Sequence, residues 1–137
     1  MRLLVTLLLF VTPTLLNAQN TIKYNELCNC PILEPSPDNC LVIPCGTVAG
    51  KLQFKNKHAE CVCIKVYLDN QMVQAATSSQ EGKFILRHLK PGNYTLVFTK
   101  RKKSWTINNL IIEANGIIKL NYDLKELDKE TDYSKAT

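Results

Sequence analysis

The chain has 137 residues, with 17 lysines and arginines against 12 aspartates and glutamates, so its formal net charge is +5 at pH 7. This length fits one domain of ordinary size once a leader is removed. The charge excess is modest and favours solubility, so we expect no nucleic-acid partner.

The first 18 residues have the layout of a secretory signal peptide. Arg2 provides a positive start, an apolar run follows over residues 3–11, and the small residue Ala18 marks a cleavage site. The alternative is a membrane anchor, but residues 3–16 fall short of the roughly 20 apolar residues that span a bilayer. We therefore predict export to the periplasm, the cell envelope or the exterior of the cell.

Residues 19–45 form an extension rich in proline and cysteine, without sustained hydrophobic periodicity. Its central stretch, CNCPILEPSPDNCLVIPC, holds four of the six cysteines. Prolines suit an extended segment, so we expect a strap lying across the outside of the folded domain.

Residues 46–124 alternate apolar and polar residues in short runs that turn signals separate. In CVCIKVYLD, for example, Val62, Ile64 and Val66 share one face, and Cys61 and Cys63 share the other. Runs of this length predict seven strands in an all-β antiparallel β-sandwich. Residues 125–137 are charged and lack an apolar stripe, so we expect a solvated polar tail.

The strand region carries short motifs in a fixed order. They are Gly46, Val48 and Gly50; Val66 and Leu68; Thr77 with Gly82-Lys83-Phe84; and Leu89 with Pro91-Gly92 and Tyr94-Thr95-Leu96. The ordered set resembles a carboxypeptidase regulatory-like domain, which implies a transthyretin-like sandwich. Gly82 and Gly92 would supply positive φ at turns, and Phe84, Tyr94 and Leu96 would fill the space between the sheets. The cysteine-rich extension and the Cys61/Cys63 pair depart from the family pattern.

The resemblance implies a non-catalytic module, since the domain is the accessory of the enzymes that it is named for. We accordingly expect no enzyme activity, no cofactor and no metal. The two histidines, His58 and His88, belong to no recognised catalytic motif. A transthyretin-like hydrolase is a second alternative, but its C-terminal Tyr-Arg-Gly-Ser motif is absent and Tyr133-Ser134-Lys135 does not replace it.

A basic run, Lys100, Arg101, Lys102 and Lys103, precedes the only tryptophan, Trp105. The strand phase places this run at a turn. The cations there either contact an anionic partner or form a solvated hairpin tip whose charge protects a sheet edge. We expect Trp105 to be a partly buried packing residue.

The cysteines Cys28, Cys30, Cys40, Cys45, Cys61 and Cys63 have spacings unlike those of zinc knuckles or of redox Cys-x-x-Cys motifs. An even number in an exported chain favours disulfides. Cysteines at positions i and i+2 of one strand have poor geometry for a disulfide bond. We therefore expect two bridges from the extension to Cys61 and Cys63, and a third within the extension. The individual pairings stay open at this level, and a small-ligand or metal carrier that uses the extension is the first alternative.

The sequence therefore predicts an exported, disulfide-stabilised β-sandwich that binds a partner or supports structure at the envelope or outside the cell. A protein or polysaccharide partner fits such a module.

Overall fold

The structure, a computed structural model, describes residues 23–135, so the predicted signal peptide lies outside the described residues. The elements are almost all strands: β1 (Lys23–Asn25), β2 (Cys30–Ile32), β3 (Gly46–Phe54), β4 (Lys57–His58), β5 (Cys63–Leu68), β6 (Gln71–Thr77), β7 (Lys83–Leu89), β8 (Gly92–Lys100), β9 (Lys103–Ile112), β10 (Ile117–Asp123) and β11 (Glu130–Asp132). Two single-turn 3-10 helices, η2 (Pro37–Cys40) and η3 (Tyr133–Lys135), complete the described chain.

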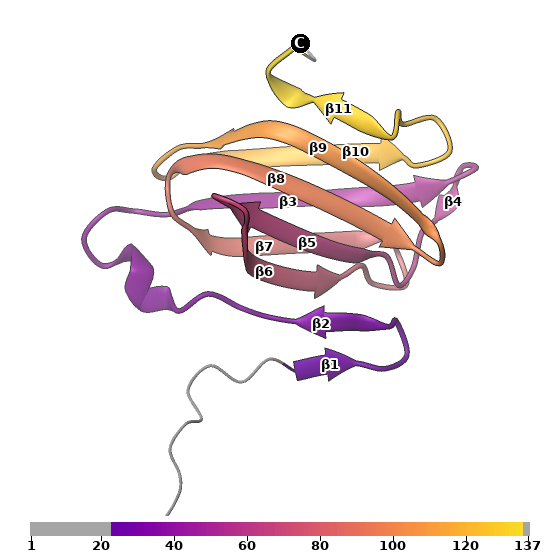
Figure 1. Cartoon of the computed structure of the whole chain (residues 1–137), viewed down its shortest axis with the longest axis horizontal. Helices are drawn as coiled ribbons and strands as arrows, with labels where there is room; N and C mark the ends of the chain where they lie inside the picture. The colour runs from indigo at the N-terminus through magenta and orange to yellow at the C-terminus, as the bar shows by residue number, and fades with distance from the viewer. Residues whose placement is uncertain (1–22, 136–137) are drawn as a thin grey trace, which may run out of the picture.

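Two sheets form a sandwich, as predicted. The strand order is β11-β9-β8-β5-β6 in one sheet and β10-β3-β4 in the other, where β7 also pairs with β3 (Figure 1). Seven strands have six residues or more, namely β3 and β5 to β10, and they correspond to the seven that the alternating pattern predicts. The four remaining strands are two or three residues long.

The strand directions differ from the antiparallel arrangement that the sequence suggested. β10 pairs with β3 in parallel, and β11 pairs with β9 in parallel. After β9 the chain turns at residues 113–116 and enters the opposite sheet instead of closing a hairpin. The alternating pattern shows which side chains are buried, but it carries no information on which strand lies alongside.

The core lies between the two sheets, where the alternating apolar residues meet. Fully buried members include Val48, Leu52, Ile64, Val66, Leu86, Leu96, Phe98, Ile107 and Leu110. Phe84 of one sheet and Phe98 of the other meet edge to face with ring centroids 6.0 Å apart. Burial of each large apolar side chain contributes about 1.5–3 kcal/mol, so this alternation is the main source of stability.

The turn motifs of the sequence have identifiable packing roles. Gly82 has φ +78°, and a Cβ there would lie 2.2 Å from the carbonyl oxygen of Leu52. Gly92 does not need a positive φ, contrary to expectation. Tyr94 is buried, and its hydroxyl donates a 2.6 Å hydrogen bond to the carbonyl of Lys90, which ties the β7–β8 turn to the core. Desolvation by burial raises the pKa of Tyr94.

The cysteine-rich extension follows an edge of the sandwich, and this corrects the strap predicted across its outer face. Leu33 and Ala75 exchange backbone hydrogen bonds of 3.0 and 2.9 Å, so the extension lies beside the edge strand β6 (Figure 1). Unpaired donors and acceptors of β6 provide this docking position, which no hydrophobic pattern reveals.

The charged C-terminal segment, expected to be a solvated tail, is ordered in part by the sandwich. Glu130–Asp132 forms β11 on the edge of β9, and the half-buried Leu127 and Tyr133 pack against the core. A free sheet edge again explains why a polar segment becomes a strand.

Candidate anion-binding groove

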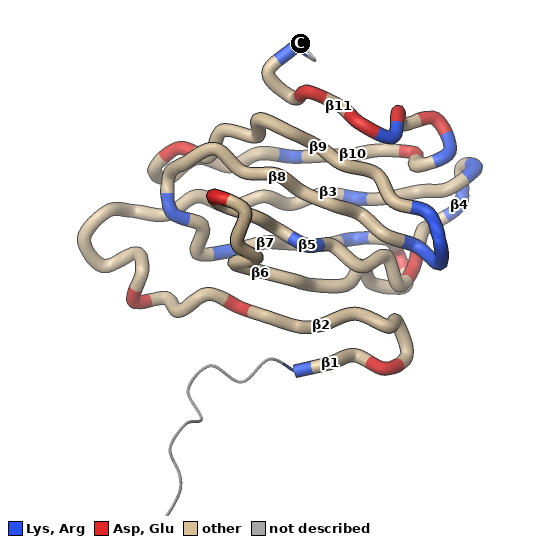
Figure 2. Tube along the Cα trace, viewed as in Figure 1, with Lys and Arg blue, Asp and Glu red and all other residues tan. Residues whose placement is uncertain are grey.

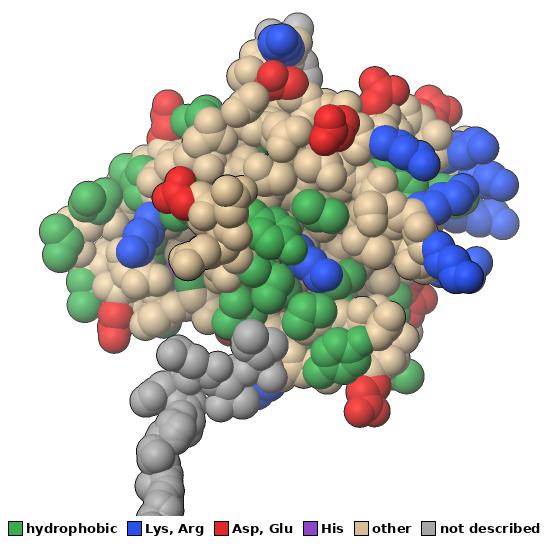
Figure 3. All heavy atoms as spheres, in the orientation of Figure 1, with side chains coloured by type: hydrophobic (Ala, Val, Ile, Leu, Met, Phe, Trp, Pro, Cys, Tyr) green, Lys and Arg blue, Asp and Glu red, His purple; other side chains and the backbone are tan. Residues whose placement is uncertain are grey.

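The turns at one end of the sandwich enclose a groove of about 670 Å³. Its lining holds six cations, Lys55, Lys100, Arg101, Lys102, Lys103 and Lys125, together with Phe54, His58, Ala59 and Trp105. The lysines and arginines gather at the right-hand end of the molecule in Figures 2 and 3. Three separate stretches of chain supply them, so the cluster exists only in the folded protein.

The basic run forms the tip of the β8–β9 hairpin, at the turn where the strand phase places it. Lys100 and Lys103 pair across the hairpin, and Arg101 and Lys102 make the turn between them. Arg101 and Lys102 are exposed, whereas Lys100 donates a 2.6 Å hydrogen bond from Nζ to the carbonyl of Glu60. The tip is therefore anchored at one residue and free at two others.

The β3–β4 turn brings further positive charge to this tip. Lys55 and Asn56 have φ values of 55° and 66°, the consecutive left-handed pair that a two-residue hairpin turn requires. The Nζ atoms of Lys55 and Lys103 lie 5.8 and 5.9 Å from the ring centre of Phe54. The electron-rich ring of Phe54 thus attracts two cations from different hairpins.

A carboxylate at the end of β10 holds the β3–β4 turn through hydrogen bonds. Asp123 accepts hydrogen bonds from the backbone amides of Asn56 at 2.8 Å, Lys125 at 2.9 Å and Lys55 at 3.1 Å. The bond from Asn56 is the largest cause of a lowered pKa for Asp123. Desolvation, the second-largest effect, opposes it, and the bonds from Lys125 and Lys55 lower the pKa further. This single side chain positions both Lys55 and Lys125 at the groove.

The sequence singled out the β8–β9 cations as possible anion contacts but not Lys55 and Lys125, which line the same groove. Both residues are far from residues 100–103 along the chain, and neither lies in a run of consecutive basic residues. Trp105 is buried at 5% exposure and packs in the core cluster, so it is more completely buried than expected.

The two histidines line different pockets. His58 lies in the groove, whose lining residues include no carboxylate. His88 lines a pocket of about 150 Å³ with Glu34, Arg87 and the buried Gln74. A hydrolase would be favoured by a polar cleft that combines either histidine with nearby carboxylates. His58 has no carboxylate beside it in the groove, and His88 shares its small pocket with one carboxylate, that of Glu34.

All six cysteines form disulfides: Cys28–Cys61, Cys30–Cys63 and Cys40–Cys45. Two bridges therefore join the extension to Cys61 and Cys63, and one lies within the extension, the arrangement expected from the sequence. β5 begins only at Cys63, and Cys61 lies in the preceding turn with φ 62°. Because every thiol is bonded, the extension has no free thiolate with which to bind a metal ion. Residues 23–135 contain no group of three or more histidine, cysteine or acidic side chains placed to hold a metal ion.

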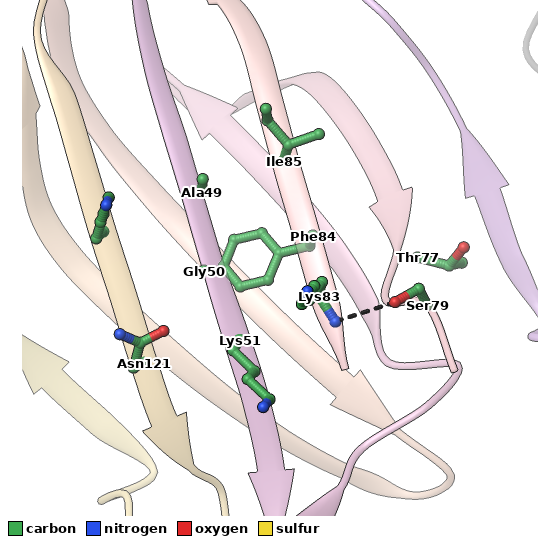
Figure 4. Close-up of a pocket in the computed structure, with 10 residues that line it drawn as sticks. Ala49, Gly50, Lys51, Thr77, Ser79, Lys83, Phe84, Ile85 and Asn121 are labelled. Atoms are coloured by element: carbon green, nitrogen blue, oxygen red, sulfur yellow. Dashed lines mark hydrogen bonds between the residues drawn. The ribbon is translucent and has the colours of Figure 1, made fainter. Parts of the chain in front are cut away.

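A second depression, of about 620 Å³, lies on the outer face of the β10-β3-β7 layer (Figure 4). Lys51, Lys83 and Lys119 project there, one from each of the three strands. Gly50 also lines it, and the backbone of β10 passes so close that a Cβ at that position would lie 1.9 Å from the carbonyl oxygen of Leu120. This face has half the cationic residues of the groove, so it serves below as a reference surface.

Comparisons with known proteins give structural neighbours only. No family model matches the chain, and no curated protein matches it. Three solved structures are similar: a DUF3823 family protein from Parabacteroides merdae (19% identity, TM-score 0.41), a candidate carbohydrate-binding protein from Bacteroides uniformis (13%, 0.46) and a type II cohesin–X-dockerin complex from Acetivibrio cellulolyticus (19%, 0.43).

The matches cover 58%, 58% and 56% of this chain, respectively. They span 45%, 41% and 51% of those chains, about half their length or less. Within residues 23–135, no helix is long and apolar enough to cross a membrane.

Proposed function

We propose that this chain is an exported, non-catalytic β-sandwich module of the carboxypeptidase regulatory-like type, and that its basic groove binds a polyanion at the cell envelope or outside the cell. The observation that carries the proposal is the convergence of six cations from three chain segments on one groove. Six cations gathered at one groove raise the local concentration of an oppositely charged ligand.

The groove has the chemistry of recognition, not of bond breaking. Its lysines and Arg101 offer donors to phosphate, sulfate or carboxylate oxygens, and charge-assisted hydrogen bonds of this kind are about twice as strong as neutral ones. His58 is the lining residue of the type that most often acts as a general base, but the lining provides no carboxylate to orient it. The proposal therefore assigns the groove to binding.

The family part of the proposal is supported by the motif residues. Gly82 occupies the turn with positive φ, and Phe84, Tyr94 and Leu96 are buried between the sheets, as the resemblance implies. The disulfides support export, because such bonds persist in oxidising compartments.

Retention on immobilised heparin, used as a soluble-polyanion probe, tests the proposal. We expect the wild-type protein to bind and the double variant Arg101→Glu/Lys102→Glu to elute at much lower salt, because both side chains are exposed at the groove. The matched control is Lys83→Glu/Lys119→Glu, which changes the net charge equally on the reference face. Equal loss of retention in the two variants would mean that net charge alone attracts heparin, and the proposal would then be wrong.

A further inference from the structure

An exposed leucine lies beside the basic groove. Leu27 is 95% exposed, in the turn between β1 and β2, and it lines a shallow depression together with Lys100 and Arg101. The next residue, Cys28, is bonded to Cys61. The disulfide therefore holds an apolar side chain in solvent next to two cations of the β8–β9 tip.

The groove offers little to a sugar ring. Carbohydrates stack on exposed aromatic faces, but Trp105 is 5% exposed and the Phe54 ring lies beneath the ammonium groups of Lys55 and Lys103. An exposed leucine, in turn, adds nothing to the binding of a sulfated or carboxylated glycan. A surface that presents phosphates above an apolar layer can bind the cations and the exposed leucine together.

We propose that this end of the sandwich docks on an anionic lipid bilayer, with Leu27 entering the boundary between head groups and acyl chains. Lys55, Arg101 and Lys102 then contact head-group phosphates. Glu26, beside Leu27, is the acidic residue of the β1–β2 turn. Basic residues combined with an apolar anchor are the general requirement for reversible binding to a membrane surface. This inference rests on the proposed function and names the class of polyanion.

Co-sedimentation with vesicles tests the inference. We expect the protein to bind vesicles of phosphatidylcholine and phosphatidylglycerol, and to ignore vesicles of phosphatidylcholine alone. Leu27→Ala should lower the partition coefficient about tenfold through the lost burial of apolar carbons. The control Leu41→Ala alters a leucine that is also exposed but lies in the loop between Cys40 and Cys45, and it should leave binding unchanged.

A spectroscopic variant gives an independent readout. In Leu27→Trp the added indole should shift its fluorescence to the blue when anionic vesicles are present, whereas the buried Trp105 supplies a constant background. Because Leu27 makes so little contact with the rest of the protein, neither substitution should impair folding.

The two proposals fail in different ways. Heparin retention without vesicle binding, or vesicle binding that Leu27→Ala does not weaken, would overturn the bilayer inference and leave the polyanion groove intact. If the wild-type protein binds neither heparin nor anionic vesicles, both proposals would be overturned.

Discussion

The two ends of the sandwich have opposite surface chemistry. At one end the β3–β4 and β8–β9 turns carry the basic groove. At the other, the loop between Cys40 and Cys45 exposes Leu41, Val42 and Ile43, and Ile117 is exposed at the start of β10. The amide of Asn115 donates to the carbonyl of Cys45 at 3.1 Å, so the disulfide loop contacts the β9–β10 turn. Figure 3 shows apolar atoms at the left end and cationic ones at the right.

The difference shows how one core supports two unlike surfaces. The strands must alternate to fill the space between the sheets, whereas the turns at either end are free of that requirement. Each end also has a disulfide near its exposed apolar side chains: Cys28–Cys61 beside Leu27, and Cys40–Cys45 around Val42. The former spans 33 residues of sequence and the latter only 5, so the basic end depends on long-range structure and the apolar end on local structure.

Removal of the disulfides should give the largest difference in stability between variants of the two ends. Cys28–Cys61 and Cys30–Cys63 close nearly the same loop, so loss of the first alone should cost about 2 kcal/mol and loss of both about 6 kcal/mol. We expect Cys→Ala substitution at all four positions to lower the free energy of unfolding, measured with urea, by far more than Cys40→Ala/Cys45→Ala, whose short loop is worth about 2 kcal/mol. Similar losses in the two variants would show that the long-range bridges have no special weight.

A smaller, pH-dependent effect on stability should come from Asp123, the carboxylate that holds the turn at the basic end. The hydrogen bonds from Asn56, Lys125 and Lys55 lower the pKa of Asp123 below its usual value of 3.8, so their stabilisation is fully present above that value and is lost as the pH falls through the folded-state pKa. Asp123→Asn should therefore be less stable than the wild type at pH 7. The difference should vanish in strong acid, as urea unfolding at several pH values would show.

Asp132→Asn is the matched control for that experiment. The pKa of Asp132 is also lowered, first by the side-chain hydrogen bond from Ser134, so the sign of the pH dependence is the same. Asp132 lies on β11 and bonds Ser134, whereas Asp123 bonds the backbone of Lys55 and Lys125, so only Asp123→Asn should also alter heparin retention. Unchanged retention in Asp123→Asn would mean that the carboxylate does not position the cations.

Substitution at the apolar end should have the smallest effect. Leu41, Val42 and Ile43 are exposed, so replacing all three with serine should change the free energy of unfolding by less than about 0.5 kcal/mol per site. Heparin retention should also stay the same. Light scattering should show less self-association, because a contiguous apolar patch is removed. A large loss of stability would mean that these side chains pack against the sandwich.

Local sequence predicted those features that depend on near neighbours. The alternation in CVCIKVYLD correctly placed Val62, Ile64 and Val66 in the core, because side chains of a strand point to opposite faces. The turn at Arg101-Lys102 followed from the phase of the flanking strands. Positive φ at Gly82 followed from the chemistry of turn residues.

Features that depend on distant segments were not predictable in this way. Lys55 and Lys125 join the groove because Asp123, at the end of β10, binds the backbone of both residues. Parallel pairing of β10 with β3 followed from a crossing between sheets, and Leu33 found Ala75 because β6 has a free edge. None of these contacts leaves a periodic signal in the chain.

By itself the sequence determined a β-sandwich, the turns between its long strands and an extension tied to it by disulfides, since periodicity, turn chemistry and cysteine spacing act over short distances. Only the tertiary structure decided that charge gathers at one end and apolar side chains at the other. That segregation arises when strands from distant parts of the chain align their turns, and alignment depends on the contacts of the whole core.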